Sequence, residues 1–161
     1  MISSRFPQRD SLLFVYGTLR PFVDIPMARW LHRVARHLGT ARTRGRLYDL
    51  GRYPGLCPGL RRGEWVVGDV YRVRRSMIYR VLDCYETGDA HDRPRFIRQR
   101  CTVWLAPRQR RNAWVYVYRR RVPPQSRIVH GDYQRHLGLK LAPRSALVAE
   151  TRLAADFLKV P

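Results

Sequence analysis

The stretch Phe14-Val15-Tyr16-Gly17-Thr18-Leu19-Arg20 is a short apolar strand that runs directly into a glycine turn. The backbone N–H groups of such a turn can face an anion, because glycine tolerates conformations that other residues avoid. Further along the chain, Leu82-Asp83-Cys84-Tyr85-Glu86 ends a helical pattern on a carboxylate that can move a proton. Each signal is common by itself, since many strands end in glycine and many helices end in a solvated glutamate. Our interpretation therefore depends on finding both in this order, together with further matching motifs.

The segments around the glycine turn predict a buried strand followed by a helix. The apolar run Ser11–Tyr16 is typical of a strand. After Asp24 and Pro26, which are typical of a helix start, apolar residues recur at helical spacing from Met27 to Leu38. We expect this helix to stop at Gly39.

From Thr40 onward most of the chain has strand character. Short extended pieces separated by glycine and proline precede a strong strand over Glu64–Val73, in which Gly68 indicates a bulge. A second helix begins at Ser76, and its expected apolar face consists of Met77, Ile78, Val81, Leu82 and Tyr85.

The last part of the sequence predicts a strand pair and a terminal helix. Arg98–Leu105 and Ala113–Tyr118 alternate as strands, joined by a charged turn over Pro107–Asn112, and residues 145–158 form an amphipathic helical pattern. Strands outnumber helices and are mostly neighbours in sequence, which predicts an α+β fold with a curled or closed sheet.

Length and composition favour a single domain over residues 1–161. A chain of 161 residues with 45% hydrophobic content is long enough to bury a core. No apolar run approaches the roughly 18 residues that a membrane span needs, and the N-terminus lacks the apolar core of a signal peptide. We expect no membrane association and a cytoplasmic location. Cys57, Cys84 and Cys101 have no CxxC spacing, so we expect reduced thiols, no disulfide and no metal site.

The charge of the chain is unusual. Lys and Arg number 32 against 12 Asp and Glu, which gives a formal net charge of +20. The basic residues are spread through the whole sequence, which argues against a basic tail. Only Lys140 and Lys159 are lysine, and the others are arginine. An electrostatic footprint for nucleic acid or acidic ligands and an arginine-loaded solvated surface both remain open. Because no recognised nucleic-acid motif accompanies the arginines, we expect no specific nucleic-acid partner, only weak non-specific binding.

Several ordered motifs resemble the gamma-glutamylcyclotransferase-like family, with the resemblance strongest over residues 12–133. Tyr16-Gly17-Thr18-Leu19 is similar to its Y-G-(S/T)-L loop, and the Leu82–Glu86 stretch to its L-D-x-Y-E helix end. The other matches are Gly45-Arg46-Leu47-Tyr48-Asp49-Leu50-Gly51-Arg52-Tyr53-Pro54-Gly55, Val67-Gly68-Asp69-Val70-Tyr71, Ala113-Trp114-Val115-Tyr116-Val117-Tyr118 and Ile128-Val129-His130-Gly131-Asp132-Tyr133.

The resemblance implies a mixed β-barrel with flanking helices and an enzyme that acts without metal or cofactor. Enzymes of this family release 5-oxoproline from a small-molecule gamma-glutamyl amide, because the substrate's own α-amine attacks its γ-carbonyl and expels the attached amine. Glu86 matches the catalytic carboxylate and is the expected general acid/base. The turn Gly17-Thr18-Leu19 is expected to hold the substrate α-carboxylate, with Tyr16 and Tyr116 as further substrate-binding residues.

Two departures from the family pattern affect the expected activity. Thr87 follows the glutamate where the family usually has glycine, and Phe96 stands where the family has a tyrosine whose hydroxyl lies near the carboxylate. Loss of that hydroxyl implies altered specificity or no activity. The alternative is therefore a non-catalytic family member that binds a small anion, or nucleic acid through its arginine-rich surface. The leaving amine and the oligomeric state stay open.

Overall fold

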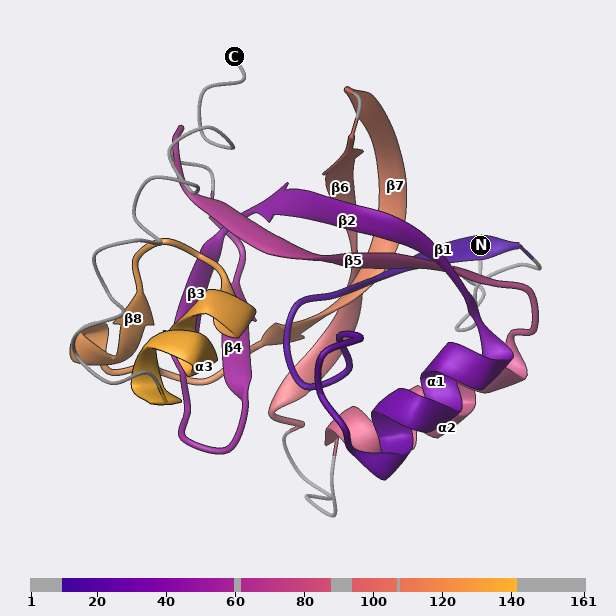
Figure 1. Cartoon of the computed structure of the whole chain (residues 1–161), viewed down its shortest axis with the longest axis horizontal. Coiled ribbons are helices and arrows are strands. Elements are labelled where there is room, and N and C mark those ends of the chain that lie inside the picture. The colour runs from indigo at the N-terminus through magenta and orange to yellow at the C-terminus, as the bar shows by residue number, and fades with distance from the viewer. Residues whose placement is uncertain (1–9, 60–61, 88–93, 107, 142–161) are drawn as a thin grey trace.

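The computed structural model describes residues 10–59, 62–87, 94–106 and 108–141. Its main feature is a closed barrel with the strand order β1-β5-β2-β6-β7 (Figure 1). Neighbouring strands are antiparallel except β1 and β7, whose parallel contact closes the barrel. The predicted α+β fold with a mixed, closed barrel is confirmed. The strands are β1 (Ser11–Val15), β2 (Arg36–Arg44), β5 (Trp65–Val73), β6 (Phe96–Leu105) and β7 (Gln109–Tyr118).

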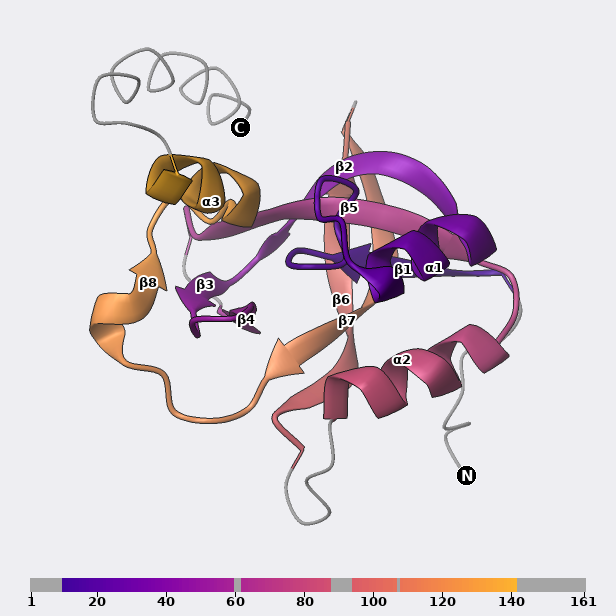
Figure 2. The same ribbon diagram turned by 60° about the horizontal axis from the view of Figure 1, so that its bottom comes forward.

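A smaller antiparallel sheet lies beside the barrel. Its strands are β4 (Pro54–Cys57), β3 (Arg46–Asp49) and β8 (Arg127–Ile128), in that spatial order, with a short 3-10 turn (Pro124–Ser126) before β8 and the helix α3 (Tyr133–Leu141) after it. Figures 1 and 2 show this sheet and α3 on one side of the molecule. The helices α1 (Pro26–Val34) and α2 (Met77–Thr87) lie together on the other side. No helix of the described ranges is long and apolar enough to cross a membrane.

Strand β1 is apolar from Leu12 to Val15 because both of its faces are covered. Phe14 points into the core inside the barrel, whereas Leu13 and Val15 pack into a second core shared with α1 and α2. A strand covered on both faces needs a continuous apolar run rather than an alternating one. The two cores therefore meet at β1, directly before the glycine turn.

The first helix is shorter than its sequence pattern predicts. It ends at Val34, and β2 begins two residues later, so the predicted stop at Gly39 is wrong. Gly39 has φ +132° and lies where the β2–β5 register shifts, which makes it a bulge residue. Asp24 makes an ion pair with Arg29 rather than a cap, which is another difference from the prediction. Strand pairing with β5 outweighs the helical spacing of the residues after Val34.

Two other local predictions change in the barrel. The β6–β7 register continues to a pairing of Leu105 with Gln109, so Gln109–Asn112 are strand rather than turn. Gly68 shows no register shift, so it is not a bulge. It is required for packing instead, because an added Cβ would lie 2.2 Å from the Val15 carbonyl oxygen. The helix predicted over residues 145–158 lies outside the described residues.

Candidate active site

The turn after β1 is a tight one that only glycine allows. The Arg20 N–H donates to the Gly17 carbonyl at 3.1 Å, which closes a four-residue turn. A Cβ on Gly17 would lie 2.7 Å from Pro54 Cγ, so the glycine lets β4 pack directly against the turn. Within the described ranges, the N–H groups of the two central residues, Thr18 and Leu19, make no backbone hydrogen bond. The turn therefore leaves two backbone donors for a ligand.

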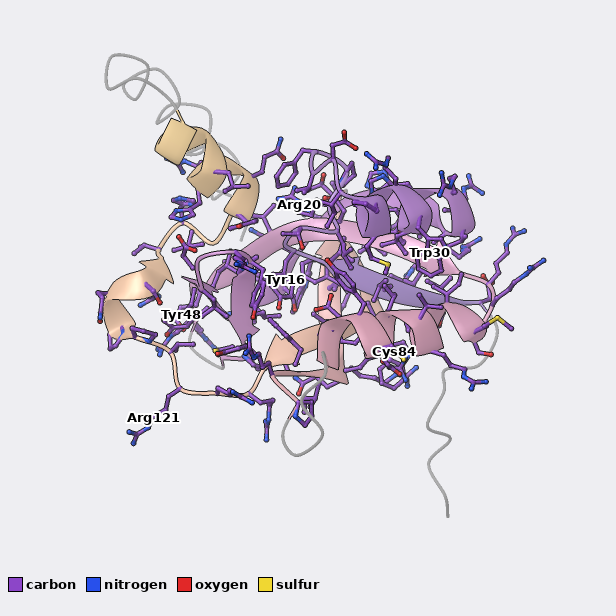
Figure 3. The ribbon with its side chains drawn as sticks, turned by 90° about the horizontal axis from the view of Figure 1, so that it is seen from below. Tyr16, Arg20, Trp30, Tyr48, Cys84 and Arg121 are labelled. Carbon is purple, nitrogen blue, oxygen red and sulfur yellow. The ribbon has the colours of Figure 1, made fainter. Side chains whose placement is uncertain are left out.

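The Tyr16 hydroxyl fixes the start of this turn. It donates to the Tyr116 carbonyl at 2.7 Å and accepts from the Leu56 N–H at 3.1 Å. Tyr16 thereby connects the end of β1 to β7 and to the smaller sheet. Figure 3 labels Tyr16 near the middle of the molecule. Burial, with a smaller contribution from the charge of Glu86, raises the pKa of this hydroxyl well above its usual value. The hydroxyl is thus a structural tie whose single donor hydrogen is already used.

Arg20 fixes the other end of the turn. Its buried guanidinium donates to Asp69 at 2.6 Å and to Asp132 at 2.9 Å. His37 contacts the second oxygen of Asp69 at 2.9 Å. Because Asp69 belongs to β5 and Asp132 precedes α3, the ion pairs join the turn to the barrel and to α3. The sequence analysis did not identify Arg20, since only the fold brings its two carboxylate partners together.

Glu86 lies in the last turn of α2 and is partly buried. In the part of the chain that the structure describes, its carboxylate makes no hydrogen bond or ion pair. Burial raises the pKa of Glu86 to about 7. Its charge in turn contributes to the raised pKa values of Tyr85 and Tyr116, after burial as the main cause, which places the carboxylate near both rings. A carboxyl group in this state can accept and release a proton near neutral pH.

The turn and Glu86 line one cavity of about 540 Å³. All six residues that the sequence analysis selected contribute to its wall, which are Tyr16, Gly17, Thr18, Leu19, Glu86 and Tyr116. The residues come from the segment after β1, the end of α2 and β7, so segments far apart in the sequence meet here. Their individual roles stay predictions.

The Tyr116 ring is held by a polar group outside the cavity wall. Its hydroxyl donates to Asp83 at 2.7 Å, and Arg98 approaches the same carboxylate oxygen at 3.2 Å. The Arg98 guanidinium lies over the Tyr79 and Trp114 rings, 4.7 Å and 5.2 Å from their centroids. Asp83 therefore positions Tyr116 and, with Arg98, fixes the side of α2 that faces the barrel.

Seven further residues line the cavity, and the sequence analysis did not select them as site residues. They are Phe14, Val15, Tyr53, Pro54, Tyr85, Arg95 and Phe96. Arg95 donates to the Tyr53 hydroxyl at 2.8 Å, and Thr18 and Tyr85 line the same cavity. Phe96, which replaces the expected tyrosine, packs edge-on against the Tyr53 and Tyr118 rings. Tyr53 lies within a family-like motif that could have indicated it, whereas Arg95 has no sequence signal.

Comparisons with known proteins give one family and several similar structures. The family model described as gamma-glutamyl cyclotransferase, AIG2-like, matches residues 13–135. YkqA from Bacillus subtilis is 23% identical with a TM-score of 0.65, and the match covers 84% of this chain but only 44% of that protein. An AIG2-like protein from Mus musculus is 22% identical with a TM-score of 0.61, covering 78% of this chain and 89% of that one. A structure titled gamma-glutamyl cyclotransferase is 14% identical with a TM-score of 0.52, covering 73% of each chain. At these identities the structural matches show a shared fold, and no curated protein matches significantly.

The double hydrogen bond of Tyr16 predicts a stability cost for Tyr16→Phe. The variant leaves the Leu56 N–H and the Tyr116 carbonyl without their partner, which should lower the free energy of unfolding by about 1–3 kcal/mol. Tyr53→Phe is the matched control, because its hydroxyl contacts the exposed Arg95, and it should cost less than about 0.5 kcal/mol. Urea unfolding of both variants makes the comparison. Equal costs would show that the Tyr16 hydroxyl is not a structural tie.

The raised pKa of Glu86 predicts that Glu86→Gln stabilises the protein at high pH. The pKa is about 7 in the folded chain against an ordinary value of 4.5, so the stability that Glu86 contributes is fully present below pH 4.5 and is lost as pH rises through 7. Glutamine does not ionise and avoids this loss. At pH 8 the variant should gain about 1–3 kcal/mol over the wild type, with little difference at pH 4.5. Urea unfolding at both pH values measures the gain, and a difference that does not change with pH would indicate a solvated carboxylate.

Proposed function

This chain belongs to the gamma-glutamyl cyclotransferase, AIG2-like family, and on that premise we propose that it is an enzyme that releases 5-oxoproline from a gamma-glutamyl amide. The observation that carries the proposal is the partly buried Glu86 carboxyl on the same cavity as the Gly17–Leu19 turn. One group can transfer protons near neutral pH, and the other offers backbone donors to a carboxylate. An intramolecular cyclisation needs little more than these two groups.

The turn binds the α-carboxylate of the glutamyl group. The N–H groups of Thr18 and Leu19 have no backbone partner among the described residues, and the cavity extends from them to Glu86. Hydrogen bonds from backbone N–H groups to a carboxylate are charge-assisted and therefore stronger than neutral ones. The ties through Tyr16 and Arg20 hold the donors in place before substrate arrives, so little ordering is required on binding.

Glu86 carries protons from the attacking nitrogen to the leaving nitrogen. The ionised carboxylate first takes a proton from the substrate α-ammonium. The free amine attacks the γ-carbonyl carbon, a C–N bond closes the five-membered lactam, and the protonated Glu86 gives its proton to the leaving nitrogen as the C–N bond to it breaks. The second proton, which the attacking nitrogen sheds on becoming the lactam N–H, passes through Glu86 to the released amine in the same way, so the amine leaves as an ammonium and the carboxylate is ionised again. A pKa of about 7 suits both steps, because the group must accept and donate at similar pH.

Arg95 and Tyr53 receive the leaving amine. They lie on the same cavity as Glu86, and their mutual hydrogen bond of 2.8 Å places a cation at the wall. Arg95 is exposed, so this contact is at the mouth rather than in the interior. A cation there favours a leaving amine that carries a negative charge, such as an amino acid, over a plain alkylamine.

A second candidate function is that of a non-catalytic protein that binds a small anion. Phe96 favours it, because this position lines the cavity without the hydroxyl that the family pattern has. The hydroxyls of Tyr16, Tyr53 and Tyr116 are all engaged in hydrogen bonds, so none of these three directly replaces the missing one. Binding of 5-oxoproline by the wild type, without turnover of any gamma-glutamyl amide, would favour this second function.

Glu86→Gln should reduce 5-oxoproline release by at least about 100-fold, because general acid–base catalysis contributes that much or more. In the wild type, kcat/KM should rise with pH and reach half of its plateau near pH 7, since the attacking form needs ionised Glu86. Chromatographic detection of 5-oxoproline from gamma-glutamyl-alanine measures both effects. Asp24→Asn, at an exposed carboxylate on the α1 side, is the control and should keep full activity. A Glu86→Gln variant with more than a tenth of wild-type activity would exclude Glu86 as the proton carrier.

Arg95→Met should discriminate between leaving groups. For gamma-glutamyl-alanine, which has an anionic leaving group, KM should rise roughly fivefold, the size expected of one exposed charge contact. For gamma-glutamyl-ethylamine, which has no such charge, KM should change less than twofold. Steady-state kinetics with the two substrates provides the measurement. Equal changes for both would assign Arg95 to the cavity wall rather than to specificity.

A further inference from the structure

The outer surface of β2 carries two arginines that have tryptophan neighbours on both adjacent strands. Ala41 and Thr43 point inward and are buried, so the alternation of the strand places Arg42 and Arg44 outside. Arg42 is in register with Trp104 of β6, and Arg44 with Trp65 of β5. Cross-strand neighbours on one face of a sheet lie close enough to interact directly.

These four side chains form one stacked cluster. The guanidinium carbons of Arg42 and Arg44 lie 4.3 Å and 4.6 Å from the Trp65 ring centroid, and that of Arg44 lies 5.9 Å from the Trp104 centroid. The two indole rings meet edge to face, with centroids 5.0 Å apart. Stacking on a ring holds a guanidinium in place while its N–H edges remain able to bind an anion.

The cluster continues along the β6–β7 hairpin. Trp104 is paired with Arg110, and Arg100 is paired with Trp114, with its guanidinium 5.3 Å from the ring centroid. Thr102 and Asn112 form the polar pair between them. We call the resulting strip the Arg–Trp face, which comprises Arg42, Arg44, Trp65, Arg100, Trp104, Arg110 and Trp114.

The positive charge of the Arg–Trp face is not neutralised by the described acidic residues. None of its four arginines has an ion pair within residues 10–59, 62–87, 94–106 and 108–141. The neighbouring Glu64 pairs with Arg46 and Arg127, which lie off this strip. The face therefore differs from the surroundings of Arg20, where the guanidinium forms ion pairs with two carboxylates.

The Arg–Trp face is separate from the candidate active site. None of its residues lines the cavity. Figure 1 shows the hairpin end of β6 and β7 extending from the barrel on the side away from α1 and α2. A partner bound here would leave the cavity accessible.

We propose that the Arg–Trp face binds single-stranded nucleic acid without sequence selectivity. Guanidinium groups pair with phosphate oxygens in a bidentate manner. Proteins that bind single strands combine such basic groups, which contact the backbone, with aromatic rings on which the bases stack. An anionic membrane requires charge but gains nothing from indole rings that arginines hold against a rigid barrel. Guanidinium–phosphate pairing and ring stacking do not depend on which base is present, so the binding is independent of sequence.

The experiment measures fluorescence anisotropy of a fluorescein-labelled dT20 oligonucleotide with the full chain at 50 mM salt. Arg42→Gln/Arg44→Gln should weaken binding at least tenfold. Arg74→Gln/Arg75→Gln, which removes the same charge from exposed residues between β5 and α2, should weaken it less than threefold. If four arginines contact phosphates, raising salt from 50 to 200 mM should weaken wild-type binding about 50-fold. Intrinsic tryptophan fluorescence should also be quenched as dT20 binds.

The conservative variant Arg42→Lys/Arg44→Lys guards against a folding defect. It keeps the charge, so it should retain most of the salt dependence, but should weaken binding severalfold because lysine does not stack as a plane. Equal losses in the Arg42/Arg44 and Arg74/Arg75 double variants would overturn the proposal, since they would show attraction by net charge alone. Tighter binding to phosphatidylserine vesicles, or to a DNA duplex of the same length, would overturn it as well.

Discussion

The buried contact of Arg20 with Asp69 and Asp132 is the interaction on which the arrangement of the candidate site depends. It ties the turn after β1 to the barrel and to the start of α3, and the Tyr16 hydroxyl ties the other end of that turn to β4 and β7. A buried ion pair contributes little net stability, but loss of one partner leaves an uncompensated charge. Its consequence here is geometric, because both ends of a glycine turn that would otherwise move are fixed.

The opposite wall of the cavity carries a group that opposes folding. The Glu86 carboxyl is partly buried with no partner among the described residues, so burial makes its ionised form unfavourable. Structural carboxylates are usually paired, as Asp69 and Glu64 are in this fold. An unpaired carboxyl beside a turn with two unpartnered backbone N–H groups is the arrangement that the proposed proton transfer requires, and a cost in stability accompanies it.

The arginines of this chain differ in what they do, although their sequence distribution is even. Arg20 and Arg98 are enclosed among carboxylates and rings, and Arg95 lines the cavity. Those of the Arg–Trp face point outward from a sheet and have aromatic rather than acidic neighbours. Strand alternation makes this division, since residues two apart share a face and their cross-strand neighbours then determine whether a guanidinium meets a carboxylate or a ring.

The sequence by itself determined the fold class, the buried strand before Gly17, and six cavity residues, because apolar periodicity and short family-like motifs are local properties. It misplaced the end of α1 and the β6–β7 turn, where pairing with β5 and β6 outweighs local propensity. Only the tertiary structure brought Asp69 and Asp132 to Arg20, placed Arg95 on the cavity, and joined arginines to tryptophans across strands. These contacts join residues distant in the chain, and closure of the barrel, rather than any local pattern, sets which of them meet.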